Sequence, residues 1–368
     1  MVDARGIARA GLLAVGLGVS AAVISAPGSA SADSSSAWLS DLIGGLSIPA
    51  AAPSTLDLQI SIDGFDLFSK TGNEATATSG SGDIAIAYGV GANASATGGV
   101  GDFAYAQGSN AFAAAGGSST DTGANYDTAI DIGNNDAPTV GTQPDGAAAG
   151  NADLIGNVSG ATGSDDTAID IGDNTSYNGI GGYDGAFAGG APMFTESGNG
   201  NGDTAIDIGD NSGFDNGSFA VFGNNNYAGD SGSNTGFLEG AYAAAGNGNT
   251  ALADTSYTTY GQAFAGEGDN NYADVLGPDN SIAVAGGGSH DVSYILDPFG
   301  TTASTALSGA GSDGGSGMYD LAAVLFTDGT ANATNGDYLY DIVTALGNET
   351  GTAAATVSAL LAELASLF

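Results

Sequence analysis

The sequence predicts an all-β fold, a parallel β-roll or β-solenoid of short arms of about nine to ten residues, with short helical caps at both ends. The heptapeptide Asp-Thr-Ala-Ile-Asp-Ile-Gly occurs three times, at 127–133, 166–172 and 203–209. Nearer the start of the repeats, Asp or Asn recurs in steps of 10, 9 and 8 residues, at Asp83, Asn93, Asp102 and Asn110. Each step has room for one strand and one turn. The 64 glycines disfavour helices and suit turns.

Charge restricts the partners of this chain. Its 368 residues carry a formal net charge of -38, with only 3 Lys or Arg and no Cys. Nucleic acids and anionic lipid headgroups are bound through Lys and Arg, so we expect no nucleic-acid partner. Cations, a cell-wall glycan and a host protein remain as candidate partners. Because no disulfide can form, we expect stability to come from repeated packing.

The first 32 residues are predicted to be a Sec-type signal peptide. Arg5 and Arg9 precede an apolar run, and small residues before Asp33 fit cleavage after Ala32. A secreted or cell-surface location follows. The rest of the chain has no apolar run long enough for a membrane span.

Five further regions are predicted along the chain. An amphipathic helix and linker are expected at 33–55, opening strands that form a cap at 56–70, and the repeat domain at 71–300. A Gly/Ser/Thr linker is expected at 301–317, and a C-terminal region with a capping helix at 318–368. The 37 to 39 residues between the identical heptapeptides are expected to hold about four arms.

Alternation along the heptapeptide separates its side chains into two faces. Thr, Ile and Ile lie on one face, and Ala and Asp on the other. Burying an unpaired carboxylate is unfavourable, and the chain has almost no cations to pair with it. We therefore expect the isoleucines to point inward and Asp131, Asp170 and Asp207 to point to solvent. Arms at Phe112 and Ile282 have the opposite phase, which indicates bulges or a change of sheet.

Two resemblances support this architecture. The [Asp/Asn]-x-Ala-x-Ala-x-Gly arms of residues 82–116 resemble the head repeats of trimeric autotransporter adhesins, which form a left-handed parallel β-roll. The copies of Ala-Ile-Asp-Ile-Gly-Asp/Asn-Asn at 129–135, 168–174 and 205–211 resemble sequences in uncharacterised exported Gly/Ala/Asn-rich repeat proteins of mycobacteria. These resemblances imply a parallel β architecture and a surface location, and they assign no residue roles.

Candidate sites are few. Asp170, Asp173, Asp207 and Asp210 place oxygen ligands at turns, where Ca²⁺ is a candidate ligand and turn geometry is the simpler explanation. Apart from this Ca²⁺, no cofactor is expected. His290 has no catalytic motif around it, and a turn residue is the preferred interpretation. Several tyrosines are candidates for stacking on sugars, although packing is favoured for them: Tyr177, Tyr183, Tyr227, Tyr257, Tyr260 and Tyr272.

These patterns predict a non-enzymatic, exported cell-surface or cell-wall repeat protein, an acidic and extended scaffold for adhesion or host contact. One alternative is a carbohydrate-active β-helix enzyme that uses paired carboxylates. A second alternative is a calcium-binding β-roll.

Overall fold

A computed structural model describes most of the repeat region. The described residues are 57–67, 72–117, 124–135, 145–150, 163–176, 184–189, 200–213, 216–232, 234, 239–255, 261–276, 281–296, 303–309, 320–325, 330–333 and 342–346. The chain divides into Met1–Pro53 and Ser54–Phe368, and every described residue belongs to the second unit. The predicted signal peptide at 1–32 and both predicted capping helices lie outside the described residues.

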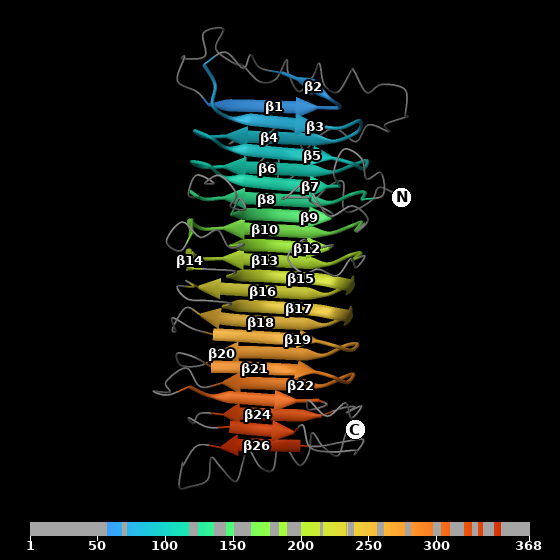
Figure 1. The fold of residues 1–368 in the computed structure, drawn as a ribbon, viewed down its shortest axis with the longest axis vertical. Helices are drawn as coiled ribbons and strands as arrows, with labels where there is room; N and C mark the ends of the chain where they lie inside the picture. Colours follow the sequence, from blue (N-terminus) through green and yellow to red (C-terminus); the bar gives the residue numbers. More distant parts are fainter. Residues whose placement is uncertain are drawn as a thin grey trace, which may run out of the picture. The chain divides into compact units, whose positions relative to one another are not determined.

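The described residues form two long sheets of short strands and contain no helix (Figure 1). Strands alternate between the two sheets along the chain, so one coil contributes one strand to each. The first sheet, here sheet A, runs in the order β2 (Phe65–Asp66), β1 (Leu58–Ile62), β4 (Ile84–Tyr88), β6 (Phe103–Gln107), β8 (Thr128–Ile132), β10 (Thr167–Ile171), β13 (Thr204–Ile208), β16 (Tyr227–Gly232), β18 (Thr250–Thr255), β20 (Tyr272–Leu276), β22 (Val292–Leu296), β24 (Leu321–Leu325) and β26 (Ile342–Leu346).

The second sheet, here sheet B, faces sheet A. It runs in the order β25 (Thr330–Ala333), β23 (Thr305–Ser308), β21 (Ser281–Gly286), β19 (Gly261–Gly266), β17 (Gly240–Asn247), β15 (Gly217–Asn224), β12 (Gly185–Gly189), β9 (Gly146–Gly150), β7 (Phe112–Gly116), β5 (Asn93–Thr97) and β3 (Thr76–Ser79). A small additional sheet pairs β11 (Asn174–Ser176) with β14 (Asn211–Gly213). The predicted parallel β-solenoid is therefore confirmed.

Coil length varies along the stack. A hydrogen bond from a backbone N–H to a side-chain Oδ1 atom joins equivalent Asp or Asn residues of successive coils. The residues so joined are 19, 25, 39, 37, 23, 23, 22, 20 and 29 positions apart. In the intervals of 39 and 37 residues, the described residues form one strand of sheet A and one of sheet B, with β11 in addition in the second, which is fewer than the four or so arms expected.

The first strands close the stack by reversing direction. β1 pairs antiparallel with both β2 and β4, whereas β4 and β6 pair in parallel. Both β1 and β2 lie within 56–70, the segment where opening strands that form a cap are predicted. At the other end, β23 lies within the predicted linker at 301–317, and the sheets continue through β24, β25 and β26.

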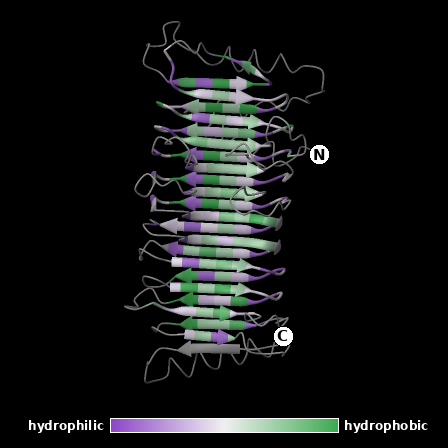
Figure 2. Ribbon diagram, viewed as in Figure 1, coloured by the Kyte–Doolittle hydropathy of each residue, from purple (hydrophilic) through white to green (hydrophobic). Residues whose placement is uncertain are grey.

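Alanines of both sheets fill the space between them. Residues such as Ala129, Ala168 and Ala205 are fully buried in one cluster with the alanines of sheet B. Figure 2 shows hydrophobic and hydrophilic residues alternating along the strands of the two sheets. Parallel pairing in register stacks these alanines on their equivalents in the next coil, whereas the next inner position changes along the stack from Asp207 and Asp230 to Ala253, Val275 and Ile295.

The predicted assignment of faces is wrong, and the isoleucines lie on the outer face. Asp131, Asp170 and Asp207 are fully buried, whereas Ile171 and Ile208 are 40% and 49% exposed. Alanines alternate with the isoleucines along these strands and belong to the interior cluster, so the isoleucines lie on the opposite side of the strand. Arms at Phe112 and Ile282 belong to sheet B, so their change of phase reflects the predicted change of sheet.

One column of glycines marks the end of the sheet A strands. A Cβ atom on any of them would lie 1.4 to 2.1 Å from a carbonyl oxygen of the next coil; they are Gly89, Gly108, Gly133, Gly172 and Gly209. No side chain tolerates that separation, so the last residue of Asp-Thr-Ala-Ile-Asp-Ile-Gly is glycine because the neighbouring backbone occupies its Cβ position.

This contact predicts that Gly172→Ala lowers the free energy of unfolding by about 2 to 3 kcal/mol, since the new Cβ would lie 1.7 Å from the Gly209 carbonyl oxygen. The matched control is Gly229→Ala, whose Cβ would meet the movable Tyr227 and Leu252 side chains at 3.1 and 3.2 Å. We expect a loss below about 1 kcal/mol there. Equilibrium unfolding in urea measures both, and equal losses would contradict the backbone explanation.

Candidate functional site

The four aspartates predicted as calcium ligands fall into two separate environments. Asp170 and Asp207 pair in register on β10 and β13, and both are fully buried between the sheets. Asp173 and Asp210 are exposed in the turn that follows these strands. Because one pair points inward and the other lies outside, the structure does not bring the four carboxyl groups together.

The exposed pair connects successive coils. The Oδ1 atom of Asp173 accepts hydrogen bonds from the backbone N–H of Asn134 at 2.7 Å and from its side-chain amide at 3.1 Å. Asp210 Oδ1 accepts the backbone N–H of Asp173 at 3.0 Å. Within the part of the chain that the structure describes, no group of three or more His, Asp or Glu side chains could hold a metal ion. Calcium binding stays a prediction.

The buried aspartates form a column with asparagines four residues later. Asp131 Oδ2 accepts a hydrogen bond from Asn135 Nδ2 at 2.8 Å, and Asp170 Oδ2 accepts one from Asn174 Nδ2 at 2.5 Å. The same bond joins Asn211 to Asp207 and Asn234 to Asp230. The amide of Asn135 also donates to the Asp145 carbonyl at 2.8 Å, which ties the corner where the chain leaves sheet A. This Asp–Asn pair replaces the cation that the sequence lacks.

A second column of Asp and Asn precedes the sheet A strands, and here it is called the corner column. Each member accepts the backbone N–H of the next member on its Oδ1 atom, at 2.8 to 3.1 Å. Its members are Asp83, Asp102, Asp127, Asp166, Asp203, Asn226, Asn249, Asn271, Asp291 and Asp320. The column therefore supplies one side-chain hydrogen bond per coil along the stack.

Burial raises the pKa of five acids in the corner column, Asp83, Asp127, Asp166, Asp203 and Asp291. The pKa is raised to about 9 for Asp127, where the carboxylate of Asp166 adds to the effect of burial, and to about 8 for Asp166 and for Asp203. The Oδ2 atoms of these three residues are buried and accept no hydrogen bond from the described residues. A protonated carboxyl group is the stable form of such a group at neutral pH.

In other coils of the corner column, asparagines take the position that these buried aspartates occupy. Asn271 Nδ2 donates to the carbonyl oxygens of Gly266 and Gly288 at 3.0 and 3.2 Å. Asn249 Nδ2 donates to the carbonyl oxygens of Ala244 and Gly268 at 3.3 and 2.9 Å. A protonated aspartic acid matches a neutral asparagine in charge and can also donate. Exchange of Asp for Asn at matching repeat positions is the sequence signal that could have found this column.

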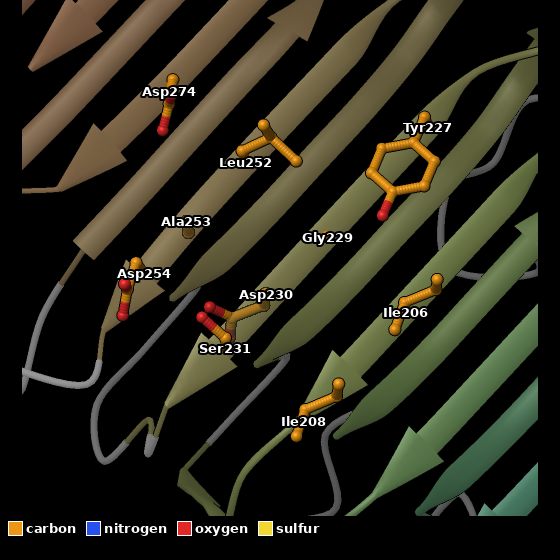
Figure 3. Close-up of a pocket in the computed structure, with 10 residues that line it drawn as sticks. All are labelled: Ile206, Ile208, Tyr227, Gly229, Asp230, Ser231, Leu252, Ala253, Asp254 and Asp274. Carbon is orange, nitrogen blue, oxygen red and sulfur yellow. The ribbon is translucent and has the colours of Figure 1, made fainter.

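The outer face of sheet A contains a groove of about 330 Å³. It lies where the column of residues in the middle of the outer face changes from isoleucine to glycine: Ile206, Gly229, Leu252 and Asp274 follow one another in register. Figure 3 shows Ile206 and Leu252 on either side of Gly229, with Tyr227 beside it. Because Gly229 has no side chain, the surface is lower at this residue than at Ile206 and Leu252 beside it.

Polar groups border this groove on one side. Ser231, Asp254 and Asp274 line it, and the Tyr272 hydroxyl donates to Asp274 Oδ2 at 2.9 Å. Burial raises the pKa of Asp274, the Tyr272 hydrogen bond lowers it, and the neighbouring Asp254 raises it again. Two acidic groups on adjacent strands thus repel each other beside an apolar floor.

The structure also places the other residues that the sequence singled out. Tyr227 is 36% exposed and its ring lies near Gly229, so the favoured packing role and a surface role both apply to it. Tyr177, Tyr183, Tyr257 and Tyr260 lie outside the described residues. His290 has φ 65° and occupies the turn before β22, as a turn histidine does.

Comparisons with protein-family models, with curated proteins and with solved structures found no match to this chain. Among the described residues there is no helix with the length and apolarity needed to cross a membrane.

The corner column predicts that stability falls as the pH rises. An aspartic acid in an unfolded chain has a pKa near 3.9, so the folded state binds more protons wherever the folded pKa is about 8 to 9. The stabilisation is complete below about pH 4 and is lost as the pH rises through 8 to 9. The loss accumulates between about pH 4 and the folded pKa of each acid, because over that interval the folded state holds a proton that the unfolded state has released.

Melting temperatures at constant ionic strength between pH 4 and 9.5 measure this loss. Exposed carboxylates finish titrating by about pH 6, so a decline from pH 6 to 9 belongs to the buried acids. Asp166→Asn should lessen the decline, because asparagine occupies matching positions of the column, whereas Glu267→Gln, at an exposed turn, should leave it unchanged. A melting temperature that stays constant from pH 6 to 9 would contradict the assignment of raised pKa values to the buried acids.

Calcium should stabilise the protein no more than magnesium does. We expect equal melting-temperature shifts in CaCl₂ and MgCl₂ at matched ionic strength, because screening of a charge of -38 depends on ionic strength alone. A specific site would discriminate between the two ions at low concentration. A gain selective for Ca²⁺, lost on combining Asp173→Ala with Asp210→Ala, would overturn this expectation.

Proposed function

We propose that this protein is a non-enzymatic, exported scaffold of the cell surface or cell wall, whose outer faces contact a partner in adhesion or host contact. The observation that carries the proposal is the filled interior. Alanine columns and hydrogen-bonded Asp and Asn columns fill the space between the sheets, joined in the later coils by Val275, Ile295 and Val324. A solenoid filled in this way offers ligands its outer faces, which repeated coils extend into a long surface.

Charge supports the same proposal. All three basic residues, Arg5, Arg9 and Lys70, lie outside the described residues, so the described surface carries acidic groups without Lys or Arg. Such a surface attracts basic proteins and cations over several ångströms and repels phosphate-bearing polymers. Export is supported by the pattern of residues 1–32.

A carbohydrate-active enzyme is the second candidate, because Asp254 and Asp274 line one groove from adjacent strands. Paired carboxyl groups beside an aromatic ring suit hydrolysis of a glycosidic bond. Release of reducing ends from cell-wall or plant polysaccharides, lost in Asp254→Asn, would favour this candidate over the scaffold.

Fractionation of the native cell with a C-terminally tagged chain tests the scaffold. We expect the protein in the envelope or the medium, and an intact mass that begins at Asp33. Cross-linking in the same cells then identifies the neighbour. A chain that retains residues 1–32 and fractionates with cytosolic markers would contradict export, whatever its surface binds.

A further inference from the structure

We propose that the groove at Gly229 on the outer face of sheet A binds a lysine or arginine side chain presented by an extended segment of a partner protein. This deepens the proposed function, since it names the chemistry of the partner and the place of contact. The geometry, the apolar walls and the charges of the groove support it independently.

The shape of the groove results from the absence of a side chain at Gly229. Ile206 and Leu252 stand on either side of Gly229 in register, so the glycine interrupts a continuous ridge of aliphatic side chains (Figure 3). A Cβ placed on Gly229 would approach Leu252 Cδ2 at 3.2 Å and Tyr227 Cε1 at 3.1 Å. The depression is therefore one side chain wide and bordered by apolar atoms.

Apolar walls suit the stem of a long basic side chain. Lysine and arginine bury their methylene groups on apolar surface and keep the charged end apart. Ile206, Ile208 and Leu252 supply aliphatic surface, and Tyr227 supplies a ring whose face attracts a cation.

Acidic groups stand at the polar side of the same groove. Asp274 keeps only part of its surface in water and holds the Tyr272 hydroxyl at 2.9 Å, and Asp254 lies close enough to raise its pKa by repulsion. The described residues contain no Lys or Arg to offset this pair. A cation from another molecule would remove the repulsion, and that complementarity selects a basic occupant.

Other ligands fit the groove less well. A bare divalent ion prefers six or more oxygen ligands, whereas apolar side chains make up half of this lining. Phosphate-bearing ligands are repelled by Asp254 and Asp274. A neutral glycan would use the tyrosine ring and gain little from two acidic groups that repel each other.

The test measures binding of a labelled peptide to the full chain by fluorescence anisotropy. The probe is an acetylated and amidated Gly/Ser peptide with one central lysine, and the control peptide carries norleucine there, which keeps the methylene stem without the charge. We expect the lysine peptide to bind more tightly by about tenfold, and expect added NaCl to weaken it.

Variants locate the binding. Gly229→Ile fills the groove and should abolish the preference for lysine. Asp254→Asn and Asp274→Asn should each weaken binding by about tenfold. Glu267→Gln, which removes one charge at an exposed turn, should change it by less than about twofold. Far-ultraviolet circular dichroism confirms that each variant is folded.

Three results would overturn the proposal. If Glu267→Gln weakened peptide binding as much as Asp254→Asn and Asp274→Asn do, the effect would be general attraction by an acidic surface. Equal affinity for the lysine and norleucine peptides would remove the role of the charge. Binding of neutral oligosaccharides that Gly229→Ile abolishes and the Asp variants leave intact would assign the groove to a glycan. None of these results bears on export, which the cell fractionation decides separately.

Discussion

Stacking in register is the constraint on which this structure depends. Parallel pairing places every side chain directly above its equivalent in the next coil, as Ala129, Ala168 and Ala205 show. A residue type that is acceptable once must then be acceptable as a column. Alanine meets this condition between two sheets that face each other, because it is small and has no polar atom to satisfy. Glycine meets it at the strand ends, where the next coil's carbonyl oxygen occupies the Cβ position.

Acidic columns meet the same condition by two chemical routes. In the corner column, a side-chain oxygen accepts one backbone N–H per coil, and burial keeps acids such as Asp127 protonated. In the other column, an asparagine four residues later donates to each aspartate. Charged aspartates stacked at strand spacing would repel one another strongly, so protonation and amide donors are what make the columns compatible with burial.

Outer faces are free of this constraint and vary from coil to coil. On sheet A the outer column changes from isoleucine to glycine, leucine and aspartate between β13 and β20, which produces the groove at Gly229. The interior changes less, since alanine continues at the first inner position of those strands. Variation outside a fixed interior is how a repeat scaffold acquires a local binding surface while its backbone stays regular.

The sequence by itself determined the repeat, the strand content, the parallel architecture and the opening hairpin, because period and alternation report local geometry. It also identified His290 as a turn residue. Only the tertiary structure decided which face is inside. Alternation separates Ile169 from Asp170 and does not orient either. The rule that charge stays outside failed because burial raises the pKa of Asp170 and favours its neutral form, while Asn174 donates a hydrogen bond to the carboxyl group. The groove was equally beyond prediction, since Ile206, Gly229, Leu252 and Asp274 become neighbours only when the register across three coil boundaries is set.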